Sequence, residues 1–371
     1  MKKRILKILL LLPILFLMAF TSVTAFAELP DFELSDYDYS LPENITDELY
    51  SNGITPDSVD LNAFDLGSAL NYLWEEFCIY IESPLKLFIS ILIVVLVCSF
   101  LGTISDNADT TVKKLFYLIC ILSGAAIITV NVSEVITYGE RTLEQGKVFV
   151  SSFIPAFAGV VSMTGRVTSA TVLNSFIMGG IQLFMQLATG IILPFGVCMM
   201  GITLAGSFDS GLKLSAFCDG IKKVVIWLLG ILMTVFVAML GLQTFITSGA
   251  DSIGLKATKF TVSNAVPFIG GAISESLSVM LGGVNVIKSN FGVFGVIAGA
   301  LLMLPSVITT LCYKLVLSFA RSLSEMFSTD GISQMIKGAE NVISIVMALL
   351  CCFLLMTVIC VSLMIFTLGG I

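Results

Sequence analysis

Residues 341–368 form a long apolar stretch that contains no charged side chain. Three further stretches, 85–104, 113–136 and 222–247, are apolar over most of their length. A bilayer's hydrocarbon core is about 30 Å thick, and roughly 20 apolar helical residues cross it. In lipid each peptide group needs a hydrogen bond from within the protein, which a helix supplies along its own length. The sequence therefore predicts an all-α polytopic membrane protein.

The composition agrees with a fold made almost entirely of spans. The chain has 371 residues, of which 57% are hydrophobic and 12% are charged. A soluble domain carries about 25% charged residues, so this composition excludes one. The stretches 168–206 and 281–318 are too long for one crossing, and we expect Pro194 and Pro305 to divide them. The resulting prediction is about 7–8 spans plus broken or re-entrant segments.

The N-terminus resembles a targeting segment. Residues 1–27 hold a basic start, an apolar run and a small-x-small motif, Ala25-Phe26-Ala27, which is typical of a signal peptide. An uncleaved first transmembrane helix is the alternative. Residues 28–84 contain 14 of the 26 acidic residues and no Lys or Arg. We expect an exported acidic segment that ends in an amphipathic helix, followed by a polytopic membrane domain, 85–371.

A phrase broken by Pro and Gly occurs twice. "SSFIPAFAGVVS" occupies 151–162 and "SNAVPFIGGAIS" occupies 263–274. A second pair of matching segments, 207–221 and 318–332, has nearly the same offset. Internal repeats of about 110 residues predict a pseudo-symmetric membrane fold. We place two full repeats and one partial repeat at about 84–193, 194–304 and 305–371.

The orientation of the repeats depends on the two phrases. If the Pro155 and Pro267 segments cross the bilayer, the repeats are parallel. If the segments are re-entrant, the repeats are inverted. Matching interrupted segments in two halves of a transporter indicate a binding site or pore lining. The candidate pore or broken-helix elements are Pro155, Gly159, Pro267, Gly271 and Glu275.

Two alternatives stay open for these residues. Pro and Gly also occur in ordinary kinked, closely packed membrane helices. Glu275 lies in an apolar context, where a carboxylate faces a cavity or a partner, but a position at the lipid headgroups fits equally. Asn174, Gln182 and Gln186 form a candidate polar stripe, suited to interhelical hydrogen bonds or to pore lining.

Enzyme signatures are absent from the sequence. The chain has no histidine, which excludes a Ser-His pair and the H-E-x-x-H zinc motif. We predict no catalytic residues, no metal and no cofactor, and no basic patch suggests nucleic acid as a partner. The nine cysteines show no CxxC spacing and are interpreted as small core residues. Arg321 and Glu325 are one helical turn apart and predict an ion pair.

The layout and two segments are similar to a known family. The segments are 266–292, "VPFIGGAISESLSVMLGGVNVIKSNFG", and the earlier "SSFIPAFAGVVS". Together with a signal sequence, a short exported arm and a polytopic domain, they resemble the stage III sporulation protein AE family of endospore-forming bacteria. The resemblance covers essentially the whole chain, and the family has no catalytic motif to compare.

The resemblance implies a place in a multiprotein channel, or feeding apparatus, between mother cell and forespore. It implies the mother-cell membrane around the forespore as the location, with residues 28–84 facing the intermembrane space. The implied partners are other stage III A sporulation proteins, including an ATPase, and indirectly a forespore membrane protein. The implied role is a permease-like or export-gate-like membrane subunit. A non-conducting platform and a stand-alone secondary transporter are the alternatives.

Overall fold

The described part of the chain covers most of the predicted membrane domain. The computed structural model describes residues 41–51, 53–56, 74, 77–105, 110–164, 166–208, 214–265, 270–327 and 329–366. It describes the backbone alone within 102–105, 110–111, 113–114, 252–265 and 270–286 and at 215, 245, 248, 250 and 288. The predicted signal peptide, 1–27, and most of the exported segment, 28–84, lie outside these residues.

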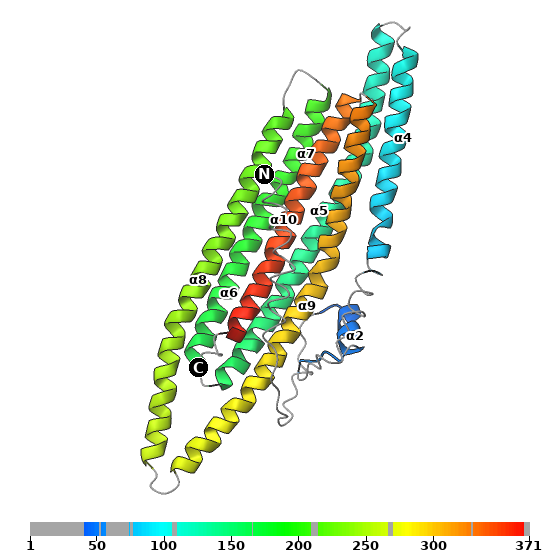
Figure 1. Ribbon diagram of the computed structural model, residues 1–371. Helices are drawn as coiled ribbons and strands as arrows, with labels where there is room; N and C mark the ends of the chain where they lie inside the picture. The colour runs from blue at the N-terminus through cyan, green and yellow to red at the C-terminus, as the bar shows by residue number, and fades with distance from the viewer. Residues whose placement is uncertain are drawn as a thin grey trace.

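Long helices make up the described part (Figure 1). A short helix, α2, precedes them, and a five-residue π-helical turn, η1, joins α6 to α7. The elements are α2 (Glu43–Ser51), α4 (Glu82–Ser105), α5 (Thr110–Met163), α6 (Val167–Leu187), η1 (Ala188–Ile192), α7 (Leu193–Phe208), α8 (Leu214–Ala265), α9 (Gly270–Met326) and α10 (Asp330–Phe366).

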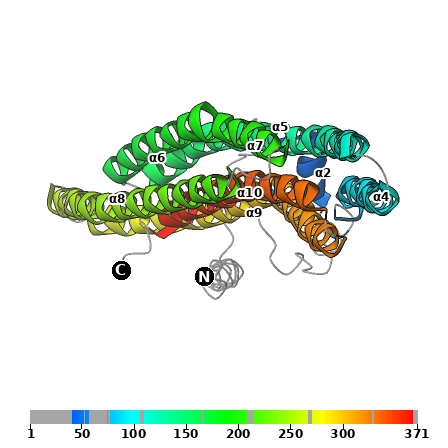
Figure 2. The ribbon, with the colours of Figure 1, turned by 90° about the horizontal axis from the view of Figure 1, so that it is seen from above.

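The long helices form an up-and-down bundle. Helices α4, α6–α7 and α9 run in one direction, and α5, α8 and α10 run in the other (Figure 1). Seen from above, α5, α6 and α7 form one layer, and α8, α9 and α10 form the other (Figure 2). Helix α10 contacts α9, α5, α8 and α7, so it is the central element of the bundle.

Six helices in the described part are long and apolar enough to cross a membrane. They confirm the predicted all-α polytopic fold and make the chain a multi-pass membrane protein. Two divisions that we expected, at Pro194 and Pro305, are not present among these six helices, and the predicted total of about 7–8 spans for the whole chain stays a prediction. The six are Phe77–Leu101, Leu115–Met163, Val167–Phe208, Ala216–Thr244, Ser289–Met326 and Asp330–Phe366.

Three prolines lie within these helices or at the start of one without separating two spans. Pro155 lies inside α5 and Pro305 lies inside α9. Pro194 is the second residue of α7, directly after η1, and α6 and α7 continue in the same direction (Figure 1). A Pro removes one backbone hydrogen bond, but neighbouring helices and local π geometry keep such a helix together in a membrane protein. The prediction that Pro194 and Pro305 each separate two spans was therefore wrong.

Three helices are much longer than a bilayer crossing requires. Helices α5, α8 and α9 have 54, 52 and 57 residues. At 1.5 Å per residue they measure about 80 Å or more, against about 30 Å for the hydrocarbon core. In α5 five of the seven charged residues lie in the middle, from Glu134 to Lys147, and the other two are at its start. Part of each rod therefore extends beyond one straight crossing of the bilayer.

Phenylalanine side chains fill the contact between α5 and α9. Phe149, Phe153 and Phe157 follow one another at four-residue spacing on α5 and are fully buried. The Phe153 ring stacks on Phe291 of α9 with 4.7 Å between the ring centroids. Further ring pairs join Phe157 to Phe291 and Phe153 to Phe294. Buried aromatic rings of this size are a large part of the energy of a packed core.

Glycines of α9 make the room for these rings. A Cβ atom at Gly295 would collide with the Phe153 ring. One at Gly299 would lie 3.4 Å from Phe149, and one at Gly292 would lie 3.1 Å from Phe157. From Gly292 to Gly299 along α9, the contacting side chain on α5 changes from Phe157 back to Phe149. The two helices therefore pack antiparallel and in a fixed register. Glycine carries no Cβ atom, which lets two membrane helices approach each other closely.

The helix pattern does not test the predicted repeat. The first phrase, 151–162, is entirely helical and lies at the end of α5. The second, 263–274, begins in the last residues of α8 and continues into the first residues of α9. The two copies therefore differ in their backbone surroundings, and the repeat stays a prediction.

Two of the cysteines are paired. Cys98 of α4 and Cys120 of α5 form a disulfide with 5.7 Å between their Cα atoms. The bond joins the two helices of the first hairpin. Interpreting all nine cysteines as small core residues was incorrect for this pair. Cys218, Cys312 and Cys360 are free and buried, as that interpretation predicts.

We expect Gly295→Ala to destabilise the bundle. The new methyl group would press on the buried Phe153 ring, and overpacking of this kind costs about 1–3 kcal/mol. The matched control is Gly159→Ala in α5, where a Cβ atom would meet nothing within 4 Å. Thermal unfolding in detergent should show a lower midpoint for Gly295→Ala and an unchanged or raised midpoint for Gly159→Ala. Equal midpoints would contradict the α5–α9 packing.

Candidate functional site

The first repeated phrase packs through residues other than its Pro and Gly. Pro155 and Gly159 are exposed on α5, whereas Phe153 and Phe157 point into the core. Positions four residues apart share one helix face, so the phrase has an apolar inner face and an outer face of Pro and Gly. Among the described residues, no atom lies within 4 Å of the position that a Cβ at Gly159 would take.

The second phrase is described only in part. Pro267 lies outside the described residues. Gly271 and Glu275 belong to the backbone of α9, and their side chains lie outside the description. The prediction that the two phrases meet as pore-lining elements therefore stays a prediction for all five residues.

The predicted polar stripe lies on α6. Gln182 and Gln186 are exposed, and Asn174 is half-buried. The Asn174 amide oxygen is buried without a hydrogen-bond partner in the described part. No hydrogen bond joins Gln182 or Gln186 to another described residue. The interhelical bonds suggested from the sequence are therefore not formed by these two amides within the described chain.

A polar cluster that the sequence did not reveal joins α8 to α10. The Lys337 ammonium lies 2.6 Å from a carboxylate oxygen of Asp219. The other oxygen of Asp219 accepts a hydrogen bond of 2.8 Å from the Asn341 amide. Lys222 in turn donates to the Asn341 oxygen at 3.0 Å. Each donor has an acceptor, so this α8–α10 cluster fixes the two helices against each other.

Arg321 extends the polar contacts to α9. Its guanidinium contacts Glu340 of α10 at 3.1 Å and Glu325 of its own helix at 3.2 Å. The second contact confirms the ion pair predicted from the four-residue spacing. The first links α9 to α10, three residues from the Lys337 contact with α8. Pairing lowers the cost of placing these charges at partly buried positions.

Asp251 of α8 caps the first turn of α6. The carboxylate accepts hydrogen bonds from the backbone amides of Thr168 at 3.2 Å and Ser169 at 2.8 Å. The first amides of a helix have no partner in the helix itself, so a buried carboxylate at this point is well placed. Burial lowers the pKa of nearby Arg166, and the Asp251 charge opposes that shift.

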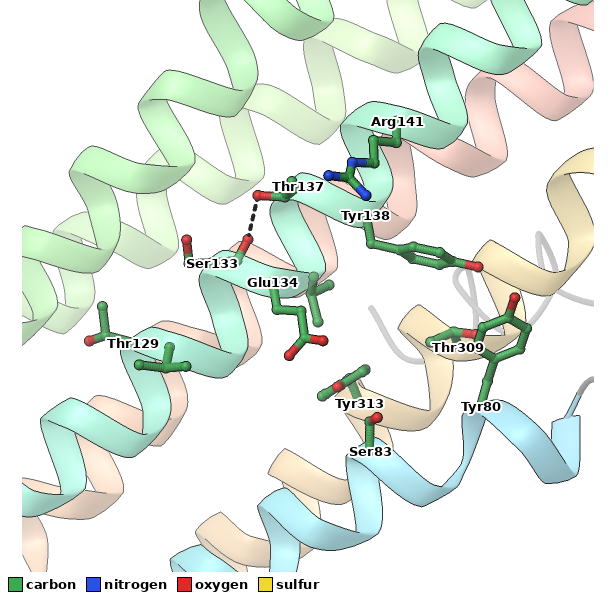
Figure 3. A pocket seen from close by; sticks show the side chains of 12 residues that line it. Tyr80, Ser83, Thr129, Ser133, Glu134, Thr137, Tyr138, Arg141, Thr309 and Tyr313 are labelled. Atoms are coloured by element: carbon green, nitrogen blue, oxygen red, sulfur yellow. Dashed lines mark hydrogen bonds between the residues drawn. The ribbon is translucent and has the colours of Figure 1, made fainter.

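A polar groove lies where α4, α5 and α9 meet (Figure 3). Its volume is about 700 Å³. Side chains from the helical segment 77–80 just before α4, from α4, from the middle of α5 and from α9 line it. They are Tyr80, Ser83, Thr129, Val130, Ser133, Glu134, Val135, Thr137, Tyr138, Arg141, Thr309 and Tyr313.

The groove combines one negative charge, one positive charge and a set of hydroxyl groups. Glu134 and Arg141 are exposed, seven residues apart on α5, and neither forms an ion pair with another described residue. Tyr313 is buried in the floor, with Ser83 and Glu134 as neighbours of its phenol. The Tyr80 and Tyr138 rings lie 5.9 Å apart across the groove. These groups can bind both ends of a zwitterion.

The sequence contained one signal for this groove. Glu134 and Arg141 interrupt an apolar helix on one face, since seven residues make almost two full turns. The parts of the groove outside α5 could not be predicted. Tyr80 and Tyr313 are far from Glu134 in the chain, and no local pattern connects them.

The matching family model covers almost every described helix. The family is stage III sporulation protein AE, and its model matches residues 54–367. This chain belongs to that family. The resemblance drawn from the two sequence segments is thereby confirmed, and a role in sporulation follows from membership. The described polar groove and the α8–α10 cluster both lie within the matched region.

A curated relative bears the same family name. Stage III sporulation protein AE of Bacillus subtilis (strain 168) is 18% identical to this chain over 232 residues. The match covers 62% of this chain and 57% of the relative. No solved structure matches the chain. The family description names a sporulation protein and no class of enzyme. Among the described residues no group of three or more His, Cys, Asp and Glu side chains could hold a metal.

We expect Lys337→Asp to weaken the contact between α8 and α10. The new carboxylate would face Asp219 without a cation between them, and losing a charged hydrogen bond costs about 1–3 kcal/mol. The double variant Asp219→Lys, Lys337→Asp restores opposite charges and should recover part of the unfolding midpoint. Lys86→Glu is the control, because its pair with Glu82 is solvent-exposed and should leave the midpoint unchanged. A double variant no more stable than Lys337→Asp alone would argue against the pairing.

Proposed function

We propose that this protein is a permease-like or export-gate-like membrane subunit of the channel that joins mother cell and forespore during endospore development. Family membership over residues 54–367 is the observation that carries the proposal. The partners are other stage III A sporulation proteins, including an ATPase, and indirectly a forespore membrane protein. The location is the mother-cell membrane around the forespore, with residues 28–84 toward the intermembrane space.

The interior of the bundle bears on where a conduction path could run. Phenylalanines fill the space between α5 and α9, and α10 is buried along most of its length. A filled centre favours a path between subunits over one through a single chain. The outer face of α5 suits a contact with another subunit, because Pro155 and Gly159 are exposed there and leave the backbone open to close approach.

The filled centre also supports a second candidate, a non-conducting platform. A platform anchors the assembly and needs no path for a substrate. A stand-alone secondary transporter is the third candidate, and it differs because the purified chain would transport by itself. These three functions predict different outcomes when the outer face of α5 is altered.

The test uses Gly159→Trp in sporulating cells. A Cβ at Gly159 would meet no described atom within 4 Å and the position is exposed, so we expect the protein to fold and insert normally. Two quantities are measured, namely co-purification with the ATPase partner and the yield of heat-resistant spores. Leu242→Trp, at an exposed position of α8, is the control and should leave both unchanged.

The combined result separates the candidates. We expect Gly159→Trp to abolish spore formation while the assembly still co-purifies, which supports conduction. Loss of co-purification would instead support the platform. Transport by the purified chain in vesicles would support the secondary transporter. Normal spore yield with Gly159→Trp would contradict any role of the outer face of α5 in the channel.

A further inference from the structure

We propose that the polar groove between α4, α5 and α9 binds the zwitterionic head group of a phospholipid, with phosphoethanolamine as the preferred chemistry. Arg141 binds the phosphate, and Glu134 binds the primary ammonium. The proposal concerns a ligand site in the protein itself and is independent of the proposed channel function.

The two charges in the groove are complementary to a ligand with two opposite charges. Glu134 and Arg141 lie on the same face of α5, and their Cα atoms are separated by about 10 Å along the helix. They form no ion pair with each other or with another described residue. A zwitterion placed between them would neutralise both. Figure 3 shows the two side chains in one row along α5.

The positive end of the groove has the donors that a phosphate needs. The Arg141 guanidinium offers five N–H donors in a planar fork, the geometry that matches two phosphate oxygens. Tyr138 lies three residues away on the same face, and its ring reaches toward Tyr80 of the segment before α4. Charge-assisted hydrogen bonds of this kind are about twice as strong as neutral ones.

The negative end suits a primary ammonium. The Glu134 carboxylate points toward Ser83 and Tyr313 across the groove (Figure 3). These three residues offer one anionic and two neutral oxygen acceptors, matching the three N–H donors of a primary ammonium. A quaternary ammonium has no N–H group to donate, so phosphoethanolamine is preferred over phosphocholine.

The surroundings favour a lipid over a free metabolite. Val130 lines the groove and is exposed, and Leu85 and Ile89 on the adjoining part of α4 are exposed as well. Acyl chains attached to a bound head group could continue over this apolar surface. Tyrosines concentrate at the membrane–water interface, and three of them line the groove.

The experiment measures lipid binding to the purified, delipidated full chain in detergent by native mass spectrometry. The probes are phosphatidylethanolamine, phosphatidylglycerol, phosphatidylcholine and free phosphoethanolamine. We expect Arg141→Gln to weaken binding of all three phospholipids by about tenfold, since one strong charged contact is lost. We expect Glu134→Gln to remove the preference for phosphatidylethanolamine while binding of phosphatidylglycerol persists.

The controls lie on the same helix. Glu144→Gln and Lys147→Gln change charge in the middle of α5 outside the groove and should bind lipid as the unaltered chain does. Circular dichroism checks that each variant is folded. Arg141→Lys keeps the charge and serves as a second variant, with binding between that of the unaltered chain and Arg141→Gln.

Two results would overturn the proposal. Equal lipid affinities in the unaltered chain, Arg141→Gln and Glu134→Gln would show that the groove is not the binding site. Binding of free phosphoethanolamine as tight as that of phosphatidylethanolamine would show that the acyl chains contribute nothing and that the site takes a soluble zwitterion.

Discussion

The contact of α5 with α9 depends on one geometric condition, which is that α5 stays helical through Pro155. Only then do Phe149, Phe153 and Phe157 fall on one line and meet the glycines of α9 in register. Helical hydrogen bonding is the one way for a peptide to satisfy its polar groups in lipid without a partner strand. This requirement, with packing by α9 and α10, keeps the chain helical where Pro removes a bond.

The general fold could be predicted from the sequence, but the course of the helices could not. Apolar length is a property of consecutive residues, so 222–247 and the described part of 341–368, as far as 366, were correctly placed within long helices. Pro194 and Pro305 were misjudged because local sequence shows the lost hydrogen bond and not the neighbours that compensate for it. The Lys337–Asp219 pair spans 118 residues, and no local pattern indicates a contact at that separation.

For the candidate site too, local features could be predicted from the sequence and contacts between distant segments could not. The repeated phrase drew attention to Pro155 and Gly159, which lie on the outer face of α5, whereas its phenylalanines hold the core. The polar groove was not predicted from the sequence, where Glu134 and Arg141 are its one local trace. The interior of the bundle is packed, and its polar features lie at the surface. The outer face of α5 and the polar groove are therefore the places where partner subunits and lipid head groups could contact the bundle.

The most direct test is the distance between Val130 and Met163, both exposed on α5. Spin labels are placed at Val130→Cys and Met163→Cys after the exposed Cys78 and Cys198 are replaced by Ser. A continuous helix predicts about 50 Å, since 33 residues rise 1.5 Å each. A distance below about 35 Å would mean that the chain turns back between the two labels, which would contradict the continuous helix and the phenylalanine register that depends on it.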